Sequence, residues 1–348
     1  MVVVGADVHK RTHTFVAVDE VGKQLGQVTV AATTKGHHKA MSWAWRTFGR
    51  ELVWAIEDCR HLSARLERDL LSAGQSVVRV PPKMMAEQRR TGRTRGKSDP
   101  IDALAVARAA QREPDLPVAS HDEVSRELKL LVDRRDDLVK HRTATINRLQ
   151  WRVHELDPEI PAKALDHAKR QQQLADALAS FDCLLAEIAA DELADVVELT
   201  SRINGLERRI AARVEQVAPT LLGMPGVGAL TAAKIVGEAA DVTRFRSEAA
   251  FARHSGIAPI PVWSGNTAGR VRLTRSGNRQ LNAAIHRIAI TQIRLDGLGK
   301  TYYQKKKAEG MSTPEAVRCL KRRLARIVFN HLHSDHQARA ATGLATAA

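Results

Sequence analysis

The first 80 residues alternate short apolar, β-branched runs with segments of helical periodicity, and this alternation restricts the fold more than any other feature. Val, Ile and Thr favour extended backbone, whereas helices repeat apolar residues at three- and four-residue spacing. Strands with helices between them predict an α/β domain with a mostly parallel or mixed sheet, whose sites form at strand ends. We predict strands over 2–8, 14–18, 28–30, 52–56 and 77–80, and helices over 37–49 and 62–73.

Acidic residues occur where such a sheet would place a site. Asp7 lies at the end of the first predicted strand and Glu57 at the end of the fourth. Carboxylates that converge there would bind two divalent cations, Mg²⁺ or Mn²⁺, which activate a nucleophile and stabilise a leaving oxygen in phosphoryl transfer. A slip of one residue would exchange Glu57 for Asp58, so both are candidates for the second acid.

Residues 97–103 (Lys-Ser-Asp-Pro-Ile-Asp-Ala) add two acids where a basic segment meets a predicted helix. Pro100 suits the first helical position because it has no N–H, which makes Asp99 the expected N-cap. Asp102 then lies on the same side of the helix as Asp99. The pair would complete a four-acid metal site. Alternatively, Asp99 only caps the helix and Asp102 only interacts with its positive end.

The net charge of +15 indicates a polyanionic partner, nucleic acid before an acidic membrane. The charge is concentrated in two segments. Residues 244–328 hold 18 Lys and Arg against 4 acids, and residues 79–97 hold 7 against 1, whereas residues 120–220 hold 15 against 19. The basic segment 79–97 is expected to be mobile until it meets phosphate. Its candidate phosphate contacts are Arg89, Arg90, Arg93, Arg95 and Lys97.

Apolar residues recur at mostly three-, four- and seven-residue spacing from Val124 to Leu156. This pattern predicts a long helix with a coiled-coil-like seam. Further helices are expected over about 163–189 and 192–217, after the prolines at 158 and 161. The packing could be antiparallel within one chain or between chains. We expect residues 119–218 to form a helical oligomerisation region between domains at 1–118 and 219–335.

A glycine-rich turn from Gly223 to Gly228 precedes another predicted helix. The turn resembles the hairpin of helix-hairpin-helix modules, in which backbone N–H groups bind a DNA phosphate without reading its sequence. Gly226 and Gly228 are the candidate contacts. An ordinary Pro-Gly turn between helices is the alternative.

Ser264 lies in a non-helical loop beside Gly265 and shortly before several arginines. A serine hydroxyl becomes an effective nucleophile when nearby groups accept its proton or stabilise the developing charge, and arginines or a metal do the latter. Ser255 and Ser276 are fallback candidates. The arginines expected to contact nucleic acid are Arg270, Arg272, Arg275 and Arg279.

The C-terminal part is expected to be mainly helical, with helices over 280–295 and 313–333. Two tyrosines and three lysines separate these helices, and such a group suits contact with bases and phosphates. The lysines are Lys305, Lys306 and Lys307. His331, His333 and His336 are interpreted as a solvated helix end, and residues 336–348 as a disordered tail.

No apolar run is long enough to span a bilayer, and the first residues lack a signal-peptide pattern. The three cysteines are widely spaced, so neither disulfides nor a zinc site are expected. These features predict a soluble, cytoplasmic protein without a membrane partner.

Several short motifs, in this order and spacing, resemble one family: the bridge-RNA-guided insertion-sequence transposases, or insertion sequence 110 family. The resemblance covers nearly the whole chain. One feature departs from the family pattern: relatives often have two adjacent serines followed by glycines and a lysine, whereas Trp263 precedes a lone Ser264 here. The motifs are Gly5–Lys10, Ala55–Glu57, Arg90–Gly92 with Lys97–Ala103, Met224–Gly228 with Thr231-Ala232, Gly256–Pro259 with Ser264-Gly265, and Ser276–Asn278.

The resemblance implies an N-terminal RuvC-like domain of ribonuclease H fold, a coiled-coil middle and a C-terminal transposase domain. It also implies an Asp-Glu-Asp-Asp metal site and a nucleophilic serine that attaches covalently to DNA. Carried over to this chain, the acids are Asp7, Glu57, Asp99 and Asp102, and the nucleophile is Ser264. A structured guide RNA would pair with donor and target DNA. Active sites shared between subunits of a homo-oligomer, a dimer or tetramer, are implied as well.

Two alternatives remain from the sequence. A RuvC-like nuclease would use water as its nucleophile, with Ser264 only lining the loop, and would form no covalent intermediate. A non-catalytic nucleic-acid-binding protein would use its acids as helix caps, and substitution of Asp102 would change no activity. The resemblance favours a transposase from a prokaryotic cytoplasm, associated with the nucleoid when active.

Overall fold

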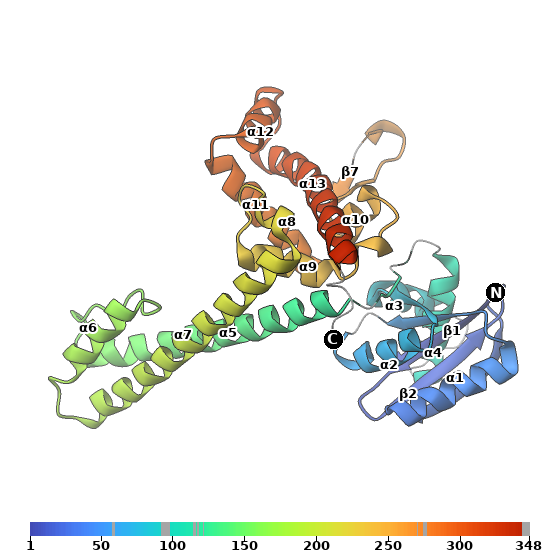
Figure 1. Ribbon diagram of the computed structural model, residues 1–348, viewed down its shortest axis with the longest axis horizontal. Coiled ribbons are helices and arrows are strands. Elements are labelled where there is room, and N and C mark those ends of the chain that lie inside the picture. The colour runs from blue at the N-terminus through green and yellow to red at the C-terminus, as the bar shows by residue number, and fades with distance from the viewer. Residues whose placement is uncertain are drawn as a thin grey trace. The chain divides into compact units, whose positions relative to one another are not determined.

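The computed structural model (Figure 1) describes residues 1–57, 60–91, 98–113, 116, 118–120, 122–269, 271–273 and 277–342. The chain forms two compact units. The first unit combines Met1–Asp122 with Ala240–Asn282 and Lys321–Phe329. The second contains the segments between these and the chain from Asn330 onward.

Residues 1–122 are built on a five-stranded mixed sheet with strand order β3-β2-β1-β4-β5. β1 pairs antiparallel with β2 and parallel with β4, which in turn pairs parallel with β5. All five predicted strands are confirmed, and the sheet is mixed. The strands are β1 (Val2–Val8), β2 (Thr12–Val18), β3 (Gln24–Ala31), β4 (Leu52–Glu57) and β5 (Ser76–Val80).

Helices cover both faces of this sheet because successive side chains of a strand point to opposite faces. On one face, Met41 and Leu66 pack into a core with Val4. On the other face, Val106 packs into a second core with Val3. The helices are α1 (Thr34–Phe48) and α2 (Arg60–Ser72) on the first face, α4 (Asp99–Arg112) on the second, and α3 (Pro82–Thr91), which contacts α4.

Gly5 lets α4 lie directly against β1. A Cβ atom at Gly5 would overlap the Ala103 carbonyl oxygen and lie 2.5 Å from the Ala107 backbone nitrogen. Both obstacles are backbone atoms, so no side-chain rotation would relieve the clash. The glycine therefore fixes the distance between the sheet and the helix that carries Asp99 and Asp102.

Two 34-residue helices, α5 (Glu123–Leu156) and α7 (Leu184–Val217), form an antiparallel pair in the second unit (Figure 1). The apolar seam predicted over 124–156 therefore packs within the chain, against α7 and the shorter α6 (Ala168–Leu178). The ion pairs between the two long helices fit this antiparallel arrangement, because they join the start of α5 to the end of α7 and the reverse. The pairs are Glu127 with Arg213, Arg135 with Glu207, and Arg152 with Glu192.

The break between the two later helices of the middle region lies earlier than predicted. The helices expected over 163–189 and 192–217 are instead α6 and α7, separated by residues 179–183. The intervening sequence is Ala-Ser-Phe-Asp-Cys, and the Ser180 hydroxyl donates to the Ala177 carbonyl at 2.7 Å. Ser and Asp compete for backbone hydrogen bonds in this way and favour helix ends.

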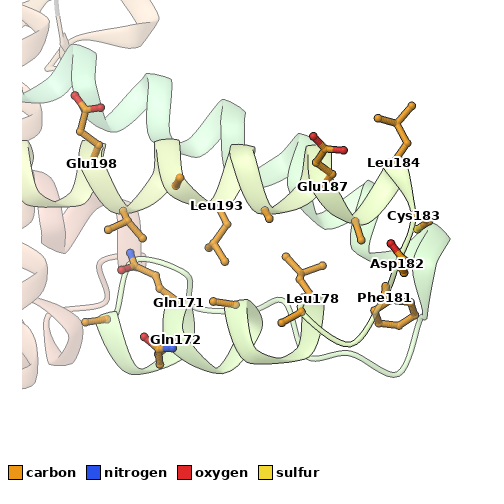
Figure 2. A pocket seen from close by; sticks show the side chains of 17 residues that line it. Gln171, Gln172, Leu178, Phe181, Asp182, Cys183, Leu184, Glu187, Leu193 and Glu198 are labelled. Carbon is orange, nitrogen blue, oxygen red and sulfur yellow. The ribbon is translucent and has the colours of Figure 1, made fainter.

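A hollow of about 1010 Å³ lies between α6 and the start of α7 (Figure 2). Leu178, Phe181 and Leu193 give it an apolar lining, with Gln171 and Glu198 at one end. None of its lining residues is basic. The hollow therefore lacks the charge that a nucleic-acid phosphate requires.

The remaining elements are mainly helical, with one short hairpin. The predicted turn after Leu222 and the helix that follows it are confirmed, and Gly226 has a φ of 83° there. The elements are α8 (Pro219–Leu222), α9 (Ala229–Ala239), η1 (Val242–Arg244), α10 (Glu248–His254), β6 (Pro259–Pro261), η2 (Gly265–Thr267), β7 (Val271–Leu273), α11 (Arg279–Arg294), α12 (Leu298–Ala308) and α13 (Thr313–Thr342).

Two expectations for this part are corrected. The tyrosines and lysines at 302–307 lie on helix α12 rather than on a connection between helices. Ion pairs one turn apart support this helix, including Lys306 with Glu309 at 2.6 Å. Residues 336–342 of the expected disordered tail belong to α13, and residues 343–348 lie outside the described part.

Contacts within the second unit explain why α13 continues. Asp335 is buried and accepts hydrogen bonds from the Thr220 and Leu221 backbone N–H groups at 3.0 and 3.1 Å. One turn further, Arg339 donates to the Val217 carbonyl at 3.1 Å. These bonds satisfy backbone groups at the α7–α8 junction that would otherwise lack partners. Among the described helices, none is both long enough and apolar enough to cross a membrane.

Candidate active site

The ends of two parallel strands bring Asp7 and Glu57 together. In the register of β1 and β4, Ala6 pairs with Ile56, so Asp7 and Glu57 are the next residues on adjacent strands. Asp7 is buried and Glu57 is half-buried. The expected convergence at this sheet edge is therefore observed for Asp7 and Glu57. The competing candidate, Asp58, lies outside the described residues.

The start of α4 adds the other two acids. Asp99 is the first helical residue, and Ser98 rather than Asp99 is the N-cap, without a side-chain hydrogen bond to the helix. The prediction of the capping role was therefore off by one residue, because Pro100 tolerates either of the first two positions of the helix. Asp102 follows one turn later and is 8% exposed. The Asp99 carboxylate is thus available for contacts outside its own helix.

His9 connects the strand end to the helix start, a role that the sequence analysis did not assign. Its Nε2 atom lies 3.0 Å from Asp7 Oδ2 and 3.5 Å from Asp99 Oδ1. Asp7, His9 and Asp99 each offer a ligand atom, and these atoms all lie within 4.8 Å of one another. The signal in the sequence was the spacing of Asp7 and His9, two residues apart at the end of one strand.

The carboxylates of the cluster repel one another. Burial raises the pKa of the Asp7 carboxyl, and Asp99 and Asp102 raise it further, against the opposing effect of His9. Burial also raises the pKa of Glu57, as do Asp7 and Asp102, while His9 and Arg89 oppose the shift. Four carboxylates crowded in a partly buried site favour a bound divalent cation, which would relieve this repulsion. The residues present therefore fit a metal of the Mg²⁺ type.

A basic side chain lies beside the acids. Arg89 Nη1 donates to Asp102 Oδ1 at 3.1 Å. Arg89 and the exposed Arg90 belong to α3, so residues 82–91 of the segment expected to be mobile form a helix. Amphipathic packing explains this, because Met84 and Met85 of the same helix pack against the α4 side of the sheet. Arg93, Arg95 and Lys97 lie outside the described residues.

Ser264 lies on a different segment, between β6 and η2, and is exposed. Trp263 beside it is 55% exposed. The fallback candidate Ser255 is fully buried, and its hydroxyl donates to the Phe251 carbonyl at 2.7 Å. Ser276 lies outside the described residues. Of the two serines that the structure describes here, Ser264 is exposed and Ser255 is buried.

The other candidate contacts are dispersed over several elements. Arg272 on β7 and Arg279 at the start of α11 are exposed, whereas Arg270 and Arg275 lie outside the described residues. Gly226 and Gly228 are in the turn before α9. On α12, Lys305 and Lys307 are exposed, and Lys306 lies 5.7 Å from the centre of the Tyr302 ring. Arg272, Arg279, Lys305 and Lys307 are therefore accessible to a nucleic acid.

Comparison with known proteins gives consistent matches. A model of the DEDD transposase of IS110 elements, described as a transposase, matches residues 4–157, and one described as the transposase of the IS116/IS110/IS902 family matches residues 218–304. A 42 kDa protein of insertion element IS900 from Mycobacterium paratuberculosis is 28% identical, over 83% of this chain and 84% of that protein. A 44.8 kDa protein of insertion element IS116 from Streptomyces clavuligerus is 26% identical, over 94% and 93%.

Solved structures similar to this chain include RuvC of T. thermophilus in complex with a Holliday junction substrate. That match has a TM-score of 0.27 and 15% identity, and it covers 34% of this chain and 99% of the RuvC chain. The two family models span most of this chain, and the IS900 and IS116 proteins match it over most of their own length. The chain therefore belongs to the IS110/IS116/IS902 family of insertion-sequence transposases.

Proposed function

We propose that this transposase cleaves and rejoins DNA through a covalent phosphoserine intermediate, with a metal site formed by Asp7, Glu57, Asp99 and Asp102. The observation that carries the proposal is the convergence of acids from β1, β4 and α4 into one partly buried cluster. Structural carboxylates are usually separated or paired with cations, because mutual repulsion in a buried site costs folding free energy. A cluster that keeps this repulsion is typical of a functional site.

The acids would hold Mg²⁺ or Mn²⁺, hard cations that prefer oxygen ligands. A bound metal supplies Lewis acidity toward the scissile phosphate and stabilises charge on the leaving oxygen. His9 would orient Asp7 and Asp99 through its position between them. Arg89 would hold Asp102 in place until nucleic acid competes for the guanidinium.

Ser264 would act as the nucleophile. Its Oγ forms a bond to phosphorus while the bond from phosphorus to a deoxyribose oxygen breaks. The serine proton leaves to solvent or a nearby base, and the departing oxygen takes up a proton. Because the phosphoserine keeps the energy of the phosphodiester, a hydroxyl of another DNA strand reverses the step and rejoins DNA without ATP. The exposure of Ser264 supports this role, and the buried, hydrogen-bonded hydroxyl of Ser255 does not favour the alternative.

Nucleic acid would be bound by the basic side chains on α3, the β6–β7 hairpin, α11 and α12, in addition to the glycine turn before α9. Phosphate contacts of this type position a duplex without reading its sequence. A structured guide RNA that pairs with donor and target DNA would supply the sequence specificity, as the family resemblance implies. The described candidates with the most direct access to solvent are Arg90, Arg272, Arg279, Lys305 and Lys307.

A homo-oligomer, dimer or tetramer, would assemble through the middle region. Exposed apolar side chains on α5 and α7 support this proposal, because burial in an interface would remove their apolar surface from water. Trp151 is 74% exposed, Leu130 is 58% exposed and Val197 is 45% exposed. An assembly would allow the acids of one subunit to act with Ser264 of another.

The experiment combines the purified protein, the RNA transcribed from its element, Mg²⁺ and end-labelled donor and target DNA. Label is then sought on denatured protein, with Ser264→Ala as the parallel variant. We expect label on the parent and none on Ser264→Ala. Cleaved DNA without label on the protein would instead identify a nuclease that uses water. Bound DNA with no cleavage and no label would support the non-catalytic alternative.

A further inference from the structure

The two ends of the serine loop, residues 257–276, meet in a tight backbone contact. A Cβ atom at Gly277 would overlap the backbone nitrogen and Cα of Gly256. Gly256 itself has a φ of 65°, a conformation that favours glycine. Beside this contact, the Asn278 backbone N–H donates to the His254 carbonyl at 2.7 Å. The loop is thus closed at its base by a short neck of backbone.

Asn282, in the first turn of α11, holds one side of this neck. Its Nδ2 atom donates to the Ser255 carbonyl at 2.9 Å and to the Gly256 carbonyl at 3.1 Å. Both N–H groups of this amide therefore donate to consecutive backbone carbonyls, those of the two residues that precede the serine loop. The side chain connects α11 to the end of α10 through the only two donors that it has.

Lys321, on α13, fixes the orientation of that amide. Its Nζ donates to Asn282 Oδ1 at 2.6 Å. The lysine is 7% exposed, and in the described part of the chain no carboxylate forms an ion pair with it. Burial lowers the pKa of the Lys321 ammonium. An ammonium group only donates, so it selects the orientation in which the amide oxygen faces Lys321 and the amide nitrogen faces the loop.

Burying a lysine without an acid is unfavourable unless the contact serves another purpose. Replacing the pair by apolar residues of similar volume would commonly be neutral or stabilising for the fold. The stability of the fold alone therefore does not require the Lys321–Asn282 contact.

The geometry points to Asn282 and Lys321 as positioning residues that hold the neck of the serine loop and thereby aim Ser264 at its phosphate. This inference rests on the proposed role of Ser264. Neither side chain touches the reacting atoms. Both act through the carbonyls of Ser255 and Gly256, from which the loop begins. Small displacements of a nucleophile lower reaction rates strongly, so a loosened neck should slow the chemical step more than DNA binding.

The first test is Asn282→Asp, which keeps the size of the side chain and its partner Lys321 but removes both donors to the loop. Under single-turnover conditions with saturating DNA, we expect the rate of adduct formation to fall by about tenfold or more. The Kd for DNA should stay the same. Asn147→Asp, the same chemical change at an exposed position of α5, should leave both quantities unchanged.

The second variant, Lys321→Met, keeps the apolar stem of the side chain and the Asn282 amide. It removes the ammonium that holds the amide oxygen of Asn282, so the amide can face either way. We expect a smaller loss of rate, about threefold to tenfold, with unchanged DNA affinity. Urea unfolding of all variants checks that each one folds. Lys321→Met keeps the test valid if Asn282→Asp does not fold.

Amide hydrogen exchange over residues 257–269 gives a readout that does not depend on the reaction. Faster exchange there in Asn282→Asp and Lys321→Met, with unchanged exchange in α5, supports the proposed clamp, which consists of Asn282 and Lys321. Unchanged exchange together with an unchanged adduct rate overturns it. If the parent forms no adduct at all, the proposed nucleophile is wrong, and with it the catalytic purpose of the clamp, even if exchange shows that the neck is held.

Discussion

The acid cluster and the serine loop are positioned by different means. The acids lie at the ends of β1 and β4 and at the start of α4, so backbone pairing and the Gly5 contact place them. The described part of the serine loop contains two short strands, and its base is held by the Gly256–Gly277 backbone contact together with side-chain bonds from Asn282 and Lys321. Regular structure gives the acids a rigid frame, whereas side-chain hydrogen bonds contribute to holding the base of the loop.

This difference has consequences for function. A metal site tolerates little displacement of its ligands, because coordination distances are short and directional. A nucleophile that must meet a long, flexible substrate is better placed on a loop that is anchored at its base and free at its tip. The two regions should therefore respond differently to the same type of perturbation.

The largest effect is expected for Asp7→Asn. The variant keeps the shape of the side chain but removes one charge from the metal site, so DNA cleavage should fall by about 10³-fold. The raised pKa of Asp7 means that its ionisation at neutral pH costs folding free energy, which asparagine avoids. The free energy of unfolding measured in urea without metal should therefore be equal to or higher than that of the parent.

Asp195→Asn, an exposed carboxylate on α7, is the matched control and should change neither quantity. Loss of cleavage together with a large loss of stability would indicate that Asp7 is a structural residue. Cleavage at the parental rate would remove Asp7 from the site altogether.

Two glycines allow the same substitution in both regions. Gly5→Ala should lower the free energy of unfolding by about 1–3 kcal/mol or more, because its Cβ meets the backbone of α4. It should also separate Asp99 and Asp102 from the strand ends and so weaken Mn²⁺ binding. Gly277→Ala should leave Mn²⁺ binding intact but loosen the neck of the serine loop and slow adduct formation.

Gly205→Ala on α7 is the control, since no heavy atom lies within 4 Å of its added Cβ. This change should raise the free energy of unfolding by about 0.5–1 kcal/mol, as expected for alanine in a helix interior. Equal losses of Mn²⁺ affinity in Gly5→Ala and Gly277→Ala would break the distinction between the two regions.

Acid should loosen the sheet before it loosens the serine loop. Burial, with help from the stacked His37, lowers the pKa of His13 to about 4. The unfolded chain then binds more protons than the folded chain below pH 6.5, so stability falls as pH drops from 6.5 toward 4. We expect a loss of about 2–3 kcal/mol over this window.

His13→Asn removes that titration and should flatten the pH dependence of unfolding over the same window. Asp69, which pairs with His37 at 2.6 Å, stays in place in this variant. Hydrogen exchange at pH 5 should show faster exchange in β2 of the parent only. An identical slope for the two proteins would exclude His13 as the source.

The smallest effect is expected at the edge of the acid cluster. Arg89→Gln removes the cation beside Asp102, so a metal no longer competes with it for that carboxylate. Because Arg89 is about one-third exposed, the ion pair is worth less than about 1 kcal/mol, and Mn²⁺ affinity should rise by about threefold to fivefold. Calorimetry without nucleic acid measures this change.

Arg90→Gln, the exposed neighbour on the same helix, should not alter Mn²⁺ affinity. A weaker affinity in Arg89→Gln would show that the arginine organises the carboxylates rather than competing with the metal.

The sequence predicted the acid cluster better than the loop for a physical reason. Strand ends and helix starts have local signatures, so Asp7, Glu57, Asp99 and Asp102 could each be placed from nearby residues. His9 could have been added from its spacing to Asp7. The contact between Arg89 and Asp102 depends on how α3 packs against α4, which local periodicity does not show.

The clamp could not be predicted in this way. Asn282 and Lys321 are 39 residues apart, and Lys321 begins a Lys-Arg-Arg run that has the appearance of a solvated basic face. Burial of one member of such a run becomes evident only from tertiary structure. The helical end of α13 could not be predicted for the same reason, since it depends on hydrogen bonds of Asp335 and Arg339 with residues of α8 and α7.

The central claim is that the acids and Ser264 act in one reaction. The most direct measurement is mass spectrometry of peptides from protein that has reacted with DNA, RNA and Mg²⁺, for the parent and for Asp102→Asn. We expect a nucleotide on the peptide that contains Ser264 in the parent and no modified peptide in Asp102→Asn. A nucleotide on another residue, or an undiminished adduct in Asp102→Asn, would contradict it.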